Sequence, residues 1–277
     1  MRQKNDPPFD PSRFSAFLLC GVLLAVSCSS APKKPAEVRA QRNSAERQLE
    51  LANQQAERGD FEGALALLEL ARQLAVTADD PDLRIRVALS RGNILFYQGK
   101  GEEAASEWAA AETEANSTGN AELVAVVRIY SARGRLLGAA AEGKGAEAAV
   151  QVKNDVNQAM DRIKKDRLSI ALGWTVTGLA EKESRRFNEA EAAVKKALGI
   201  HEKENYLEQA AYDWYLIASI RSMAGRFAEA AEALEEAIVL DRRAENSWGL
   251  AMDWRAMAEV YRKAGKNAQA EAASARS

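Results

Sequence analysis

One short pattern recurs six times along this chain of 277 residues and constrains its fold more than any other feature. It consists of a glycine, four variable residues and an alanine, as in GDFEGALALLELA at 59–71 and GRFAEAAEALEEA at 225–237. The first position is held by Gly59, Gly99, Gly143, Arg185, Gly225 and Gly265, which are 40, 44, 42, 40 and 40 residues apart. A period of about 20–50 residues indicates a repeat architecture. We therefore interpret the body of the chain as stacked copies of one unit.

Each copy of the pattern joins two predicted helices. Glycine ends a helix readily because it adopts the left-handed backbone conformation without a Cβ clash. The small alanine five residues later lets the second helix approach the first closely; it is Ala64, Ala104, Ala148, Ala190, Ala230 or Ala270. Both flanks are rich in Ala, Glu, Leu, Arg and Gln, which favour helix, and only Pro81 of the six prolines lies beyond residue 35. The sequence predicts an all-α array of helical hairpins whose apolar faces are buried by neighbouring hairpins.

We call the first residue of each copy its anchor. The residues at fixed distances before the anchors form a second pattern. Tryptophan stands eleven residues before three anchors, as Trp174, Trp214 and Trp254. A small residue stands seven before five of them, as Ala52, Gly92, Gly178, Ala218 and Ala258, and Trp108 is the aromatic residue of a second helix. Together these positions resemble the tetratricopeptide repeat family. The resemblance implies a right-handed solenoid of about six repeats over 37–277, with a period of 40–44 residues that is longer than usual for the family. The third repeat is the least regular, with Leu136 where a small residue is expected.

The same resemblance implies a functional surface on the inner face, which is formed by the first helix of each hairpin. It predicts that this face contacts a protein partner through Asn93, Tyr130, Arg133, Tyr212, Tyr215, Met252 and Arg255. Leu89, Leu172, Thr175, Ser219 and Glu259 project onto the same face. The three tryptophans at first-helix positions are predicted to pack between helices and not to stack on a ligand.

The first 27 residues differ in kind from the repeats. Basic residues precede an apolar run from Phe14 to Val26, which suits a secretory signal but is too short for a spanning helix of about 20 residues. The following AVSC resembles a bacterial lipoprotein signal, which implies lipidation of Cys28 and a tether over 28–36. The alternative is an ordinary cleavable signal that leaves Cys28 unmodified. We expect a body in the periplasm, and Ser29, which is not acidic, favours the outer membrane.

The charge balance and the scarcity of reactive residues limit the kinds of activity that we expect. Because 38 Lys and Arg face 40 Asp and Glu, the chain lacks the basic surplus of a nucleic-acid binder. No nucleophile–base pair, metal-ligand cluster or cofactor motif stands out, so we predict no catalytic, metal or cofactor site and no enzyme activity. The single histidine, His201, is interpreted as a solvated turn residue beyond a helix that ends near Ile200.

Two functional hypotheses follow. The first is a lipid-anchored periplasmic scaffold that binds envelope proteins and helps to assemble an envelope complex. The second is an accessory subunit of a solute-uptake system that docks a substrate-binding protein or carries a small ligand. An enzyme is the weakest of the three classes considered.

The anchor can be tested by metabolic labelling with an alkyne fatty acid. We expect the chain to incorporate the label, and Cys28→Ala to lose it, because a lipidated cysteine carries the acyl chains. Cys20→Ala, which lies in the segment to be removed, is the matched control and should stay labelled. A label that survives Cys28→Ala would contradict the assignment.

Overall fold

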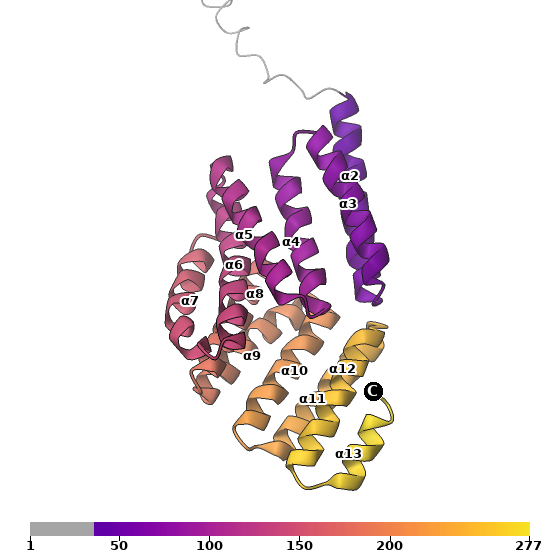
Figure 1. Cartoon of the computed structure of the whole chain (residues 1–277), viewed down its shortest axis with the longest axis vertical. Helices are drawn as coiled ribbons and strands as arrows, with labels where there is room; N and C mark the ends of the chain where they lie inside the picture. Colours follow the sequence, from indigo (N-terminus) through magenta and orange to yellow (C-terminus); the bar gives the residue numbers. More distant parts are fainter. Residues whose placement is uncertain (1–35) are drawn as a thin grey trace, which may run out of the picture. The chain divides into compact units, whose positions relative to one another are not determined.

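The computed structural model describes residues 36–277, which form twelve α-helices and contain no strand (Figure 1). The predicted signal at 1–27 and the lipidation site Cys28 lie outside the described residues. Residues from Ala40 onwards form one compact unit, and the description below concerns that unit. None of the helices in the described part is long and apolar enough to cross a membrane.

The helices alternate as first and second members of six consecutive hairpins, so the predicted all-α hairpin array is confirmed. The first members are α2 (Ala36–Glu57), α4 (Pro81–Tyr97), α6 (Ala121–Ala141), α8 (Arg167–Glu183), α10 (Leu207–Met223) and α12 (Ser247–Lys263). The second members are α3 (Phe61–Thr77), α5 (Gly101–Thr118), α7 (Gly145–Met160), α9 (Phe187–Lys203), α11 (Phe227–Arg243) and α13 (Asn267–Ser274). Helix α6 has 21 residues where most have 17, and the connection before α8 is long, which accounts for the wider spacings around the third repeat.

The recurring anchor lies at the turn inside each hairpin. All six anchor residues have a positive φ, between 57° at Arg185 and 80° at Gly59. Only Arg185 is not a glycine, and it adopts this conformation against the steric preference of a residue with a Cβ atom. The alanine five residues later is buried in every hairpin except the third, where Ala148 is half-buried and Ala149 is buried beside it. The anchors therefore mark the hairpin turns as predicted.

A second series of turns connects one hairpin to the next. Asp79, Gly119, Asn205 and Glu245 also have positive φ, and each is followed by the N-cap residue of the next first helix. Among these caps, Asp80 Oδ1 accepts a hydrogen bond from the Leu83 N–H at 3.1 Å, and Pro81 occupies the first turn of that helix. A side-chain N-cap of this kind contributes about 1 kcal/mol to helix stability.

Trp108 shows why a small residue is required seven positions before an anchor. Its side chain is fully buried (0% exposed), and its Nε1–H donates to the Leu89 carbonyl at 3.3 Å. The indole lies on Gly92, where an added Cβ would come within 2.6 Å of Trp108 Cδ1. The small residue predicted at this position thus leaves the space that the indole ring of Trp108, from the second helix, occupies.

The other three repeat tryptophans pack between helices and are half-buried. The Lys196 ammonium lies 3.9 Å from the ring centroid of Trp174. The guanidinium carbon of Arg276 lies 4.7 Å from the ring centroid of Trp254. A cation over an indole face is stabilising. The packing role predicted for these tryptophans is consistent with these contacts, although the side chains are less buried than that of Trp108.

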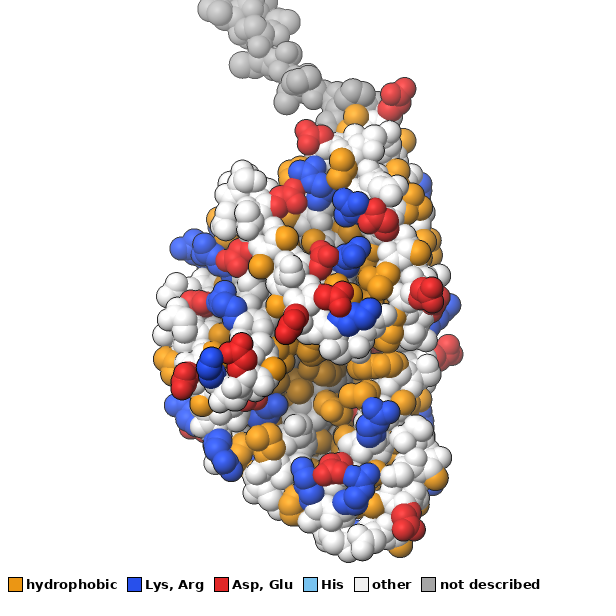
Figure 2. Space-filling view, viewed as in Figure 1, with side chains coloured by type: hydrophobic (Ala, Val, Ile, Leu, Met, Phe, Trp, Pro, Cys, Tyr) orange, Lys and Arg blue, Asp and Glu red, His pale blue; other side chains and the backbone are white. Residues whose placement is uncertain are grey.

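The curvature of the array brings its two ends together. Trp248, at the start of α12, lies edge-on to Phe61 of α3, with 6.0 Å between ring centroids, and to Tyr97 of α4, with 5.3 Å. Figure 1 shows the start of α12 below the start of α3 and the end of α4. The helices therefore surround a hollow, which Figure 2 shows from one side with hydrophobic side chains along its edge.

We expect Gly92→Ala to lower the free energy of unfolding by about 1–3 kcal/mol, because the new methyl group overpacks against Trp108. Gly199→Ala is the matched control within a helix, since a Cβ there meets no atom within 4 Å. It should stabilise the chain by about 0.5–1 kcal/mol through helix propensity. Urea unfolding measures both, and equal effects at the two sites would contradict the packing of Trp108.

Candidate functional site

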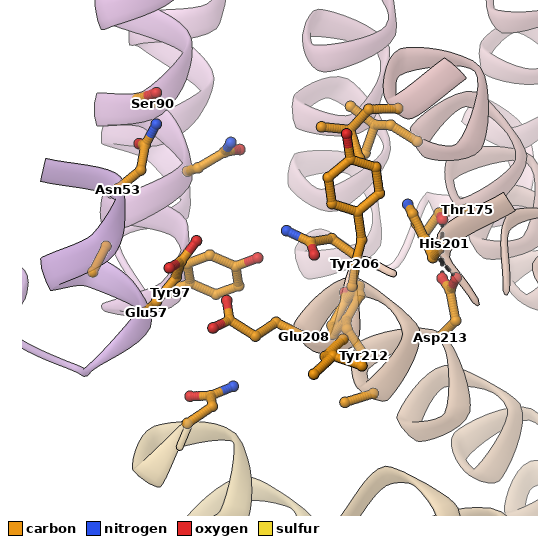
Figure 3. Close-up of a pocket in the computed structure, with 18 of the residues that line it drawn as sticks. Asn53, Glu57, Ser90, Tyr97, Thr175, His201, Tyr206, Glu208, Tyr212 and Asp213 are labelled. Carbon is orange, nitrogen blue, oxygen red and sulfur yellow. Dashed lines mark hydrogen bonds and ion pairs between the residues drawn. The ribbon is translucent and has the colours of Figure 1, made fainter. Parts of the chain in front are cut away.

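The hollow inside the array is a cavity of about 820 Å³ lined by residues from every first helix. Turns at the ends of α9 and α11 complete its wall. Figure 3 shows side chains from α2 and α4, such as Asn53 and Tyr97, facing Glu208 and Tyr212 of α10 across it. Most of the lining comes from helix positions that recur with the repeat, because a first helix turns the same face inward in each hairpin.

The structure brings together most of the residues predicted to contact a partner. Six of the seven line the cavity: Asn93, Tyr130, Arg133, Tyr212, Tyr215 and Met252. Leu89, Leu172 and Thr175 line it as well. Arg255 lies instead in a second hollow of about 490 Å³ between α10 and α12, with Ser219 and Glu259. Tyr215 and Met252 border both hollows. A role in partner binding remains a prediction for all seven.

None of the tryptophans eleven residues before an anchor lines the cavity. The tryptophan in its wall is Trp248, which also holds the two ends of the array together. Sequence reasoning missed this residue because it lies outside the repeating first-helix positions that were compared.

The interpretation of His201 as a solvated turn residue is wrong. His201 lies inside α9, is 4% exposed, and places Nδ1 2.7 Å from Asp213 Oδ2 (Figure 3). The Thr175 hydroxyl lies 3.2 Å from the other carboxylate oxygen of Asp213. Helix α9 continues past Ile200 to Lys203, as α11 continues to Arg243 one repeat later, and Asp213, which is 1% exposed, is the buried partner of the imidazole. An aspartate between Tyr212 and Trp214 in an apolar helix was the available signal.

The next repeat carries the same pair of positions with different chemistry. Asp241 follows His201 by 40 residues, and Asp253 follows Asp213 by 40. Where the earlier repeat pairs an imidazole with a carboxyl group, the later repeat places two carboxyl groups together. Asp241 accepts a hydrogen bond from the Asn246 amide at 2.9 Å, whereas Asp253 Oδ2 is buried without a hydrogen-bond partner among the described residues.

Burial of this carboxyl pair changes its titration. Burial, reinforced by the neighbouring Asp241, raises the pKa of Asp253 to about 8. Burial also raises the pKa of Asp241 to about 6, against the opposing hydrogen bonds from Asn246 and Asp253. Two close carboxyl groups titrate as a unit, so the pair holds a proton at neutral pH. Asp213 shows the same upward direction of pKa from burial, opposed by His201.

Two further carboxyl groups face each other across the cavity. Glu208 of α10 faces Glu57 of α2 (Figure 3), and burial raises the pKa of Glu208 to about 8, with Glu57 and Asp241 adding to the rise. Burial likewise raises the pKa of Glu57. Within residues 36–277, no group of three or more metal-ligating side chains is arranged to hold a metal ion.

Polar atoms without partners gather on the wall formed by α4 and α6. Asn93 Oδ1 and one terminal nitrogen of Arg133 are buried without a hydrogen-bond partner in the described part of the chain. Burial raises the pKa of Tyr130, while Asn93 and Arg133 act in the opposite direction. Buried polar groups are normally satisfied, so this wall is suited to a ligand that completes its hydrogen bonds.

No protein-family model and no curated protein matches the sequence. Among solved structures, the fold is similar to a Rap protein complexed with competence and sporulation factor, with a TM-score of 0.58 and 14% identity over 82% of this chain and 65% of that one. It is also similar to BtubC from P. vanneervenii, with a TM-score of 0.52 and 15% identity over 88% and 90% of the two chains. The chain thus spans a little under two thirds of the Rap protein. The helical-hairpin array is the fold that the sequence resemblance to the tetratricopeptide repeat family implies.

The two equivalent aspartates should respond to amidation in opposite ways. A carboxyl group whose pKa is higher in the folded than in the unfolded state keeps a proton that the unfolded chain has lost. The free energy of unfolding therefore falls as the pH rises from about 4 to about 8. We expect Asp253→Asn to remove this loss and to raise the melting temperature at pH 8.5 by about 2–4 °C, the shift that about 1 kcal/mol gives in a chain of this size.

At pH 5 the Asp253→Asn variant should melt close to the wild type. Asp213→Asn is the matched variant one repeat earlier and should melt lower at both pH values, because one of the two oxygens that face His201 and Thr175 becomes an amide NH2, which cannot accept a hydrogen bond. Calorimetry at the two pH values measures both, and a lower melting temperature for Asp253→Asn at pH 8.5 would contradict the protonated pair.

Proposed function

We propose that this protein is a non-catalytic scaffold that binds a segment of a partner protein in its central cavity. The carrying observation is that the wall formed by α4 and α6 holds buried polar atoms without partners among the described residues, at Asn93 and Arg133. A main chain or polar side chain entering the cavity would satisfy them. Tyrosine side chains along the wall, such as Tyr130 and Tyr212, add apolar area with a polar tip, as protein interfaces often do.

The proposal includes an anchor at Cys28 and a body in the periplasm, where the partner would be an envelope protein. Support for the anchor comes from the sequence at 14–28. Support for binding comes from the cavity, and the similar Rap structure is itself a complex with competence and sporulation factor. That likeness concerns the fold, so the identity of the partner here rests on experiment.

A second candidate function is favoured by the size of the cavity. Small-molecule sites typically enclose about 300–1,000 Å³, and the value of about 820 Å³ lies in that range. A chain that carries a small ligand for a solute-uptake system would use the same wall. The two functions differ in what occupies the cavity, so one experiment can separate them.

The test is site-specific photo-crosslinking in cells that produce the full chain. A benzoylphenylalanine at Asn53, which lines the cavity, should form adducts with a partner protein. The same residue at Glu235, which is exposed on α11 and outside the cavity, is the control and should form few. Equal adducts at both positions would contradict binding in the cavity.

A blocking variant sharpens the same experiment. Ser90→Trp places an indole in the cavity and should abolish the adducts from position 53, whereas Ser117→Trp, exposed on α5, should leave them unchanged. Native mass spectrometry of the purified chain decides the second function. A bound small molecule that Ser90→Trp displaces, without any protein adduct, would favour the carrier of a small ligand.

A further inference from the structure

Arg133 is a buried positive charge on the cavity wall that has no counter-ion. Its side chain is 5% exposed, and one of its terminal nitrogens has no hydrogen-bond partner among residues 36–277. Within the same residues it also takes part in no ion pair. The two other arginines of α6 behave differently: Arg128 lies 3.7 Å from Glu112 and Arg135 pairs with Asp155, and both are exposed by more than two fifths. The inward-facing arginine is thus the unpaired one.

The surroundings of Arg133 compensate its charge only in part. Its guanidinium carbon lies 4.2 Å from the ring centroid of Phe96 and 5.5 Å from that of Trp108. Such cation–π contacts are weaker than the hydration that a buried guanidinium loses. A carboxylic acid or lysine can escape this penalty by changing its protonation state, but arginine stays charged. Arg133 is therefore a position where binding of an anion is strongly favoured.

Three phenols lie within electrostatic reach of Arg133. The phenols of Tyr97, Tyr130 and Tyr212 are close enough for the arginine charge to lower their pKa against the effect of burial. The carboxyl groups of Glu208 and Asp241 act on Tyr97 in the opposite direction and raise its pKa. Asp166, the N-cap residue of α8, acts on Tyr130 in that same direction, and its carboxylate accepts hydrogen bonds from the Ser169 N–H and hydroxyl. Among the described residues, none of these three carboxyl groups forms an ion pair with Arg133.

We propose that Arg133, with the hydroxyls of Tyr97 and Tyr130 and the amide of Asn93, forms a binding site for a carboxylate group. The planar guanidinium fork matches the two oxygens of a carboxylate, and the phenols and the amide supply further donors. The proposal rests on the proposed function, since it assigns the carboxylate to the partner segment held in the cavity. An acidic side chain and a free C-terminus both supply this chemistry.

The first experiment uses a small carboxylate and does not depend on a protein partner. Thermal unfolding of the purified full chain is measured with 10 mM sodium glutarate and with glutaramide plus sodium chloride at equal ionic strength. We expect glutarate to raise the melting temperature above that of the neutral amide control. We expect Arg133→Met, which keeps the apolar stem, to abolish that difference, while Arg128→Met on the same helix retains it.

Two outcomes would overturn the carboxylate site: no stabilisation of the wild type by glutarate, or equal stabilisation of wild type and Arg133→Met. Arg133→Lys covers the case in which Arg133→Met fails to fold. It keeps the charge without the planar fork and should bind glutarate at least tenfold more weakly than the wild type, whereas unchanged glutarate affinity would contradict the site.

The second experiment separates this site from the proposed function. Affinity selection is run on random octapeptide pools with Asp, Glu and a free C-terminus, with those side chains but an amidated C-terminus, and with neither. Retention of the first two pools but not the third assigns the carboxylate to a side chain; retention of the first alone assigns it to the C-terminus. Equal retention of all three would overturn the carboxylate site but keep segment binding. If glutarate binds and no pool is retained, the carboxylate site stands and segment binding fails.

Discussion

The contact of Trp248 with Phe61 and Tyr97 is the interaction on which the cavity depends. An array of helical hairpins is an open structure in which each unit touches only its neighbours. Here one indole from the last hairpin meets rings from the first two, at 5.3 and 6.0 Å between centroids. Aromatic side chains bury a large area and prefer this edge-on geometry. The contact turns the inner face of the first helices into the wall of a cavity, where the buried polar groups are partly shielded from water and their charges act more strongly on one another.

The repeated packing positions build the cavity wall, and the residues that differ from repeat to repeat determine which polar groups line it. The second helices and the small residues near the anchors do the packing, as Trp108 on Gly92 shows. The first helices are then free to vary on their inner face. The pair His201–Asp213 and the pair Asp241–Asp253 occupy the same positions one repeat apart, yet one is an imidazole–carboxylate contact and the other a carboxyl pair that keeps a proton. On α6 the cavity wall has a buried positive charge, Arg133. The cavity lining therefore includes buried acidic groups as well as a buried arginine, which suits an occupant with more than one polar group.

Much of this fold and site could be predicted because it follows from the period. The six anchors, the helix pairs and the inward-facing positions such as Asn93 and Tyr212 depend on residues close in sequence or one repeat away. His201 could not be predicted, because its burial depends on a particular partner across the α9–α10 turn. Closure through Trp248 was missed because it depends on the rotation accumulated over five hairpins, to which every helix contact contributes a little. For the same reason Arg255 lies in a separate hollow, although its position within the repeat matches those that line the cavity. The second series of turns escaped notice because Asp79, Gly119, Asn205 and Glu245 share a conformation but not a residue type.

The most direct test of the closed array is a double-mutant cycle between α4 and α12. The free energy of unfolding is measured for Tyr97→Leu, Trp248→Leu, the double variant and the wild type. Closure through these rings predicts a coupling energy of about 0.5–1.5 kcal/mol, the range found for aromatic pairs in contact. The cycle between Tyr97 and Trp254, which is in the same helix as Trp248 but outside the cavity, should give a coupling near zero. A coupling near zero for Tyr97 with Trp248 as well would contradict the closed array and the cavity that depends on it.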